Sequence, residues 1–108
     1  MNKLEEKMYL ISLFDIYSNL LSTSQKETFN DYYCLDLSLK EIAENNNISR
    51  SAVEDCLKKC KKKLMEFENS LKIYSAKKEC LLLINDAKKI DSIDKIKEQL
   101  DLLERKIK

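Results

Sequence analysis

The chain has 108 residues with a formal net charge of +1, and it contains 44% hydrophobic residues but neither glycine nor proline. Most β-turns favour these two residues, so the composition argues against a sheet and predicts an all-helical protein of one domain, or one domain with a helical extension. The longest apolar run, 80–84, is far shorter than a membrane span, and the acidic N-terminus lacks the apolar region of a signal peptide, so we expect a cytoplasmic protein.

Two helices are expected in the N-terminal third of the chain. Apolar residues recur every three or four positions over 3–21, a pattern typical of a helix that is buried between others. The serine- and threonine-rich segment that follows ends this pattern, and either Ser24 with Glu27, as a capping box, or Thr23 can begin a second helix over about 24–35. This helix should bury three aromatic residues, Phe29, Tyr32 and Tyr33, with Cys34 as a further candidate.

A helix-turn-helix is predicted at about 38–60. Ser38 and Glu41 match a capping box, which should begin a short helix that ends near Asn45. Two helices that cross steeply need a small residue at the crossing, and Ala43 stands there. The core around it should consist of Ile42, Ile48, Val53 and Cys56. The alternative is a plain helical hairpin with no binding role.

The turn and the helix after it have their own sequence pattern. Asn47 tolerates the positive φ that such a turn requires, and Ser49 is a suitable N-cap for a helix that begins at Arg50. The apolar residues of this helix are spaced alternately by four and three positions, which is a heptad pattern. They are Val53, Leu57, Cys60, Leu64, Phe67, Leu71 and Tyr74.

This heptad stripe is longer than a helix-turn-helix needs, so we expect a homodimer. The residues expected to remain exposed for self-association are Leu64, Phe67, Leu71 and Tyr74. The alternative is that the final helix of the same chain covers the stripe.

The predicted organisation is a helix-turn-helix domain at 1–75 and a C-terminal helical extension at 76–108. The extension should contain a helix at about 77–90 and a final amphipathic helix that Asp91 or Ser92 caps.

Charged residues of the long helix suggest nucleic-acid binding. DNA-reading motifs contact base edges with the first residues of their second helix, which here include Arg50, Ser51, Glu54 and Asp55. Arg50 suits guanine or phosphate, but the two acidic residues are unfavourable beside a polyanion.

Five lysines follow: Lys58, Lys59, Lys61, Lys62 and Lys63. Over 49–64, six cations against two acids give a net charge of +4. Arg50, Ser51 and these lysines are therefore the candidate nucleic-acid-binding residues, although the lysines could instead be the solvated flank of the heptad stripe.

No feature of the sequence supports catalysis, a cofactor or a metal site. The chain lacks histidine, a glycine-rich phosphate loop and a nucleophile–base pair. Cys56 and Cys60 lie one helical turn apart, but a zinc site would also need Cys34 and Cys80 or carboxylates. We interpret the cysteines as free thiols that pack as small apolar residues.

The segment at 13–53 resembles the YlxM-like family of small bacterial proteins. The resemblance rests on the tyrosine pair at 32–33, the Asp-Leu-Ser-Leu segment at 36–39, the Glu-Ile-Ala-Glu segment at 41–44 and the Ser-Arg helix start at 49–50. With the long helix that follows, it covers about two thirds of the chain, and it does not extend to the part after about residue 80. The motif is also similar to the DNA-binding helix-turn-helix of sigma factors.

This resemblance implies a sigma-factor-like helix-turn-helix bundle and an accessory or regulatory role in the signal recognition particle pathway. The leading hypothesis is a non-enzymatic accessory protein that binds the particle's RNA or its GTPase partners. The second is a DNA-binding transcriptional regulator, and the third is a protein–protein adaptor that binds no nucleic acid.

Overall fold

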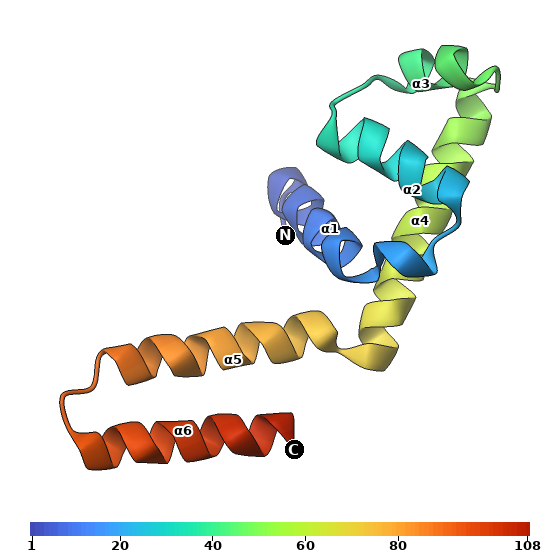
Figure 1. Ribbon diagram of the computed structural model, residues 1–108. Coiled ribbons are helices and arrows are strands. Elements are labelled where there is room, and N and C mark those ends of the chain that lie inside the picture. Colours follow the sequence, from blue (N-terminus) through green and yellow to red (C-terminus); the bar gives the residue numbers. More distant parts are fainter. The chain divides into compact units, whose positions relative to one another are not determined.

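The computed structural model describes residues 1–108 and consists of helices without any strand, which confirms the predicted all-helical class (Figure 1). The chain forms two compact units, Met1–Leu71 and Lys72–Lys108. The division lies a few residues before the expected boundary at 75–76, because Lys72 has a φ of 55° and ends the long helix there. None of the helices has both the length and the apolar character that crossing a membrane requires.

The first unit begins with α1, which covers Lys3–Tyr17 and continues into a short 3-10 helix, η1, at Ser18–Leu20. The Asn2 side chain caps α1 by accepting a hydrogen bond from the Glu5 N–H at 2.8 Å. As the apolar spacing predicted, α1 contributes to the core, with three fully buried residues: Leu10, Leu13 and Tyr17.

Helix α2 covers Thr23–Phe29 and begins at a different cap from those predicted. Ser22 accepts from the Gln25 N–H at 3.2 Å, and the Gln25 side chain accepts from the Ser22 N–H at 3.0 Å. This reciprocal pair replaces both expected caps, because Ser22 is the residue whose backbone is extended. The helix then widens into a π-helix, η2, at Asn30–Cys34, in which the Leu35 N–H reaches the Asn30 carbonyl at 3.0 Å.

Helices α3, Leu39–Asn46, and α4, Arg50–Leu71, form the helix-turn-helix. α4 begins at the predicted residue. α3 meets the first turns of α4, and α1 and α2 pack farther along it (Figure 1).

The core of the first unit lies along the heptad stripe of α4, where Val53, Cys60 and Leu64 are completely buried. A chain of aromatic contacts stabilises this packing: Phe14 stacks on Phe29 at 4.3 Å between ring centroids, and Phe29 contacts Tyr33 at 4.5 Å.

The second unit is a hairpin of α5, Ile73–Lys88, and α6, Ile93–Ile107, which run antiparallel (Figure 1). Both predicted helices are present, although α5 begins earlier than expected. The two helices enclose an apolar groove of about 250 Å³ lined by residues such as Leu83, Ile96 and Leu103. An ion pair of 2.6 Å between Lys106 and Glu79 also joins them. No side chain of this unit is fully buried.

Candidate nucleic-acid interface

The turn of the helix-turn-helix is built from local hydrogen bonds. Ser38 accepts from the Glu41 N–H at 3.1 Å, and the Glu41 carboxylate accepts from the Ser38 N–H at 3.1 Å, which confirms the predicted capping box. Asn47 ends α3 in the left-handed conformation with a φ of 55°, as predicted. The Ile48 N–H then reaches back to the Ala43 carbonyl at 3.1 Å, which satisfies a carbonyl at the helix end.

The crossing of α3 and α4 agrees with the prediction except at Ile48 and at Cys56, which is only partly buried and is absent from the buried cluster. Ala43 is buried at the crossing and belongs to one cluster with Ile42, Val53 and Leu57. Ile48 was expected in this core but is 43% exposed. It is the second residue of the turn that ends α3, so its side chain is left at the surface. It lines an open hollow of about 520 Å³ around the turn.

The start of α4 presents few free groups for reading bases. Ser49 accepts from the Ala52 N–H at 3.0 Å and caps the helix, and Arg50 and Ser51 follow as exposed residues. The Arg50 guanidinium lies 3.6 Å from the Glu54 carboxylate, one turn along the helix. Part of its charge is therefore already compensated, and the exposed Asp55 adds a further negative charge.

The five candidate lysines divide into two groups. Lys61 forms an ion pair with Glu6 of α1, and Lys63 donates a 3.3 Å hydrogen bond to the Gln25 side chain of α2. The Lys61–Glu6 contact, largely through its hydrogen bond, raises the pKa of Lys61 and lowers the pKa of Glu6. These two lysines therefore hold α1 and α2 on α4.

The other three lysines, Lys58, Lys59 and Lys62, are exposed and form no ion pair. Successive residues of an α-helix are rotated by about 100°, so these positions lie on the side opposite the buried stripe. We call them the outer lysine face. Asp55 and Glu66, both exposed, lie before and after it on α4, so the positive charge is concentrated over about two turns.

The structure brings only part of the expected self-association stripe to the surface. Leu64 was expected to be exposed, but it is completely buried in the core. Phe67 is half-buried and contacts Tyr17 at 5.9 Å between ring centroids. The stripe was also expected to continue through Tyr74, but α4 ends at Leu71 and Tyr74 belongs to α5. Leu71 remains as the large exposed apolar residue of this stripe.

All four cysteines are free thiols, but only Cys60 packs in the core as predicted, whereas Cys34 is exposed and Cys56 and Cys80 are partly buried. Cys60 is completely buried, and its thiol lies 3.5 Å from the Gln25 carbonyl. Burial, followed by the neighbouring Cys56, raises the pKa of Cys60 to about 12, so the thiol stays protonated at neutral pH. The structure has no group of three or more histidine, cysteine, aspartate or glutamate side chains arranged to hold a metal ion.

Comparison with known proteins shows relatives along nearly the whole chain. Residues 4–107 match the model of a family described as "Putative helix-turn-helix protein, YlxM / p13 like". A UPF0122 protein of Ureaplasma parvum serovar 3 is 44% identical over 94 residues, which cover 84% of this chain and 95% of the relative. A UPF0122 protein of Fusobacterium nucleatum is 41% identical over 100 residues, covering 90% and 97% of the two chains. The match also includes α5 and α6, for which the sequence had suggested no relative.

Proposed function

The chain belongs to the YlxM / p13-like helix-turn-helix family, and from this premise we propose that it is a non-catalytic regulatory protein that binds nucleic acid through the outer lysine face of α4. A helix-turn-helix family supports nucleic-acid binding, and an all-helical fold of this kind fits a non-enzyme. The proposed location is the cytoplasm.

The observation that carries this proposal is the division of the lysines on α4. Lys58, Lys59 and Lys62 point away from the core without carboxylate partners, whereas Lys61 and Lys63 have partners on α1 and α2. Unpaired lysines on one helix face suit the phosphate backbone, whose neutralisation releases counterions and favours binding regardless of sequence.

We propose structured RNA as the main ligand. Base reading in the major groove of DNA needs free donors at the start of α4, but Arg50 is paired with Glu54 and Asp55 is exposed beside them. A phosphate-binding surface does not depend on that groove, and RNA helices are recognised mainly by shape and backbone. The resemblance to the YlxM family implies the signal recognition particle pathway, so the particle's RNA is the first ligand to test and its GTPases are the second.

The second candidate is a DNA-binding transcriptional regulator. The hollow around the turn carries Lys40 on α3 and Arg50 on α4, and both can contact the backbone of a duplex in a helix-turn-helix complex. The same hollow includes Glu44, which weakens this candidate.

A pull-down from cell lysate with the full chain, with and without nuclease, tests the proposal. We expect RNA to be recovered, and we expect proteins that depend on that RNA to be lost after nuclease treatment. Recovery of a defined DNA fragment would favour the regulator. Recovery of proteins alone, unchanged by nuclease, would show an adaptor and contradict nucleic-acid binding.

A further inference from the structure

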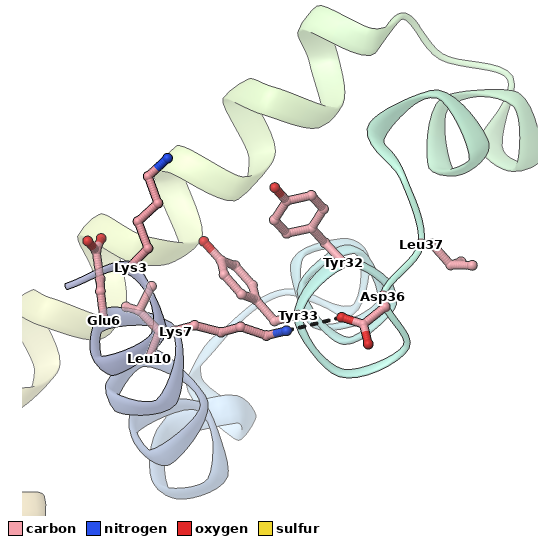
Figure 2. Close-up of a pocket in the computed structure, with 8 residues that line it drawn as sticks. All are labelled: Lys3, Glu6, Lys7, Leu10, Tyr32, Tyr33, Asp36 and Leu37. Atoms are coloured by element: carbon pink, nitrogen blue, oxygen red, sulfur yellow. Dashed lines mark hydrogen bonds and ion pairs between the residues drawn. The ribbon is translucent and has the colours of Figure 1, made fainter.

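A pocket of about 410 Å³ lies between α1 and the π-helix η2 (Figure 2). Its aromatic walls are Tyr32 and Tyr33 of η2, and its apolar lining includes Leu10. Its charged lining comprises Lys3, Glu6, Lys7 and Asp36. A pocket of this size with aromatic walls and a few polar groups suits a small planar ligand.

Two unusual features of the backbone form this pocket. The π-helix η2 carries both tyrosines, and single π-turns of this kind occur frequently at functional sites. Asp36 has a φ of 56°, a left-handed conformation that is uncommon outside glycine, asparagine and aspartate. In that conformation its carboxylate forms a 3.0 Å ion pair with Lys7, which joins the segment after η2 to α1 at one side of the pocket (Figure 2).

The tyrosines form a supported aromatic platform. Tyr33 contacts Phe29 at 4.5 Å, and Tyr32 meets Tyr33 edge to face at 5.0 Å between ring centroids. Because Phe29 is completely buried, the platform is anchored in the core of the first unit. Both rings remain half-exposed, and Figure 2 shows them projecting from η2 toward α4. Because the two rings lie at 89° to each other, a planar ring can stack on the face of one, Tyr32, while Tyr33 forms the adjoining wall.

The charges around the pocket favour an anionic group attached to that ring. Both acidic residues of the lining are already paired, Glu6 with Lys61 and Asp36 with Lys7. Lys3 forms no ion pair, so the pocket retains a free positive charge. Through Lys61 the pocket adjoins α4, and Lys58 lies one turn from Lys61 on that helix.

We propose that this pocket binds an unpaired nucleobase of the nucleic acid that the outer lysine face holds, with Tyr32 as the ring on which the base stacks, Tyr33 as the adjoining aromatic wall and Lys3 as a phosphate contact. This inference rests on the proposed function and adds a preference for bulged or single-stranded positions. Unstacked bases are the parts of RNA that proteins bind through aromatic side chains, and each stacked base contributes roughly 1–3 kcal/mol.

The test compares three RNA hairpins of one sequence by fluorescence anisotropy with the full chain. The hairpins are fully paired, bulged at one adenosine, or bulged at an abasic residue, and the same set in DNA shows whether the sugar matters. We expect the bulged adenosine to bind roughly 5- to 150-fold more tightly than the abasic bulge, which keeps the phosphates but lacks the base. Tyr32→Ala should remove this difference, and Tyr32→Phe should preserve it.

Equal affinity for the adenosine and abasic bulges would overturn the base pocket while leaving phosphate binding intact. Binding of none of the hairpins would contradict the proposed function itself. If Tyr32→Ala does not fold, as judged by circular dichroism, 2-aminopurine at the bulge provides the second measurement. Its fluorescence should be quenched when the wild-type protein binds, because the base stacks on Tyr32. Unchanged fluorescence at saturating protein would overturn the inference.

Discussion

The Tyr17 hydroxyl at the end of α1 donates a 2.7 Å hydrogen bond to the Glu68 carboxylate of α4, and both side chains are buried. A buried side chain that loses its hydrogen-bond partner is left unsatisfied, so a buried contact of this kind contributes to stability. This contact fixes the C-terminal part of α4 to α1, at the end of the first unit that lies away from the helix-turn-helix.

Removing the hydroxyl should therefore destabilise the protein. We expect Tyr17→Phe to lower the free energy of unfolding by about 1–3 kcal/mol, because the buried Glu68 side chain loses a hydrogen-bond donor. Urea denaturation followed by circular dichroism measures this. Tyr32→Phe is the matched control, since its hydroxyl lies at the pocket surface, and its effect should stay within about 0.5 kcal/mol. Equal effects of the two substitutions would show that the Tyr17–Glu68 hydrogen bond contributes little.

Asn47 should be replaceable by glycine but not by alanine. Its φ of 55° costs an ordinary residue roughly 1–2 kcal/mol, whereas asparagine and glycine adopt it readily. We expect Asn47→Ala to lower the melting temperature and Asn47→Gly to leave it unchanged or raise it. Asn45→Ala, at an exposed position within α3, provides the control and should not destabilise the protein. A stable Asn47→Ala variant would be inconsistent with a turn in this conformation.

Thiol labelling should distinguish Cys60 from Cys34. Cys34 is exposed, whereas Cys60 is buried and its pKa of about 12 keeps the thiolate fraction very small at pH 8. We expect iodoacetamide to modify Cys34 in the native protein and Cys60 only after unfolding in urea, with mass spectrometry locating the modified residue. Rapid native labelling of Cys60 would mean that the contact of α2 with α4 opens readily.

Self-association, if it uses the stripe of α4, should depend on Leu71. This residue is 54% exposed at the end of α4, whereas Leu64 is buried and cannot contribute. We expect a dimer by light scattering at micromolar concentration and a monomer for Leu71→Glu. Asn69→Glu adds the same charge at another exposed position of α4 and should remain dimeric. A monomeric wild-type protein would refute the homodimer.

The sequence predicted those parts of the fold that depend on short-range chemistry. The Ser38–Glu41 capping box, the left-handed Asn47 and the Ser49 cap each involve residues within three positions of one another, and all three were predicted correctly. The cap at Ser22 was missed because the three adjacent residues at 22–24 are all suitable caps. The end of α4 was missed because lysine, unlike glycine or asparagine, gives no sign of a left-handed residue at 72.

The candidate interface could be predicted only as a cluster of positive charge. Whether a lysine of α4 is free depends on residues far away in the sequence: Glu6 pairs with Lys61, and Gln25 binds Lys63. The pocket at Tyr32 and Tyr33 likewise requires α1 to lie beside η2. Such pairings come from tertiary packing, which apolar spacing along one helix does not specify.

The most direct test of the proposed function is the salt dependence of RNA binding, compared between a variant with three lysines replaced and a variant with two lysines replaced. Fluorescence anisotropy over a salt series should give a log–log slope of roughly −2 to −5 for the wild type, at about −0.7 to −0.9 per phosphate contact. Replacing Lys58, Lys59 and Lys62 by glutamine should make the slope less negative by about 2 and weaken binding to every sequence alike.

Replacing Lys61 and Lys63 by glutamine is the matched comparison, because these lysines come from the same run but contact α1 and α2. This variant should keep most of the wild-type slope, although its stability should fall slightly. We expect a clearly less negative slope only for the outer-face variant. Equal slopes for the two variants, or binding that does not respond to salt, would contradict the proposal that the outer lysine face holds the nucleic acid.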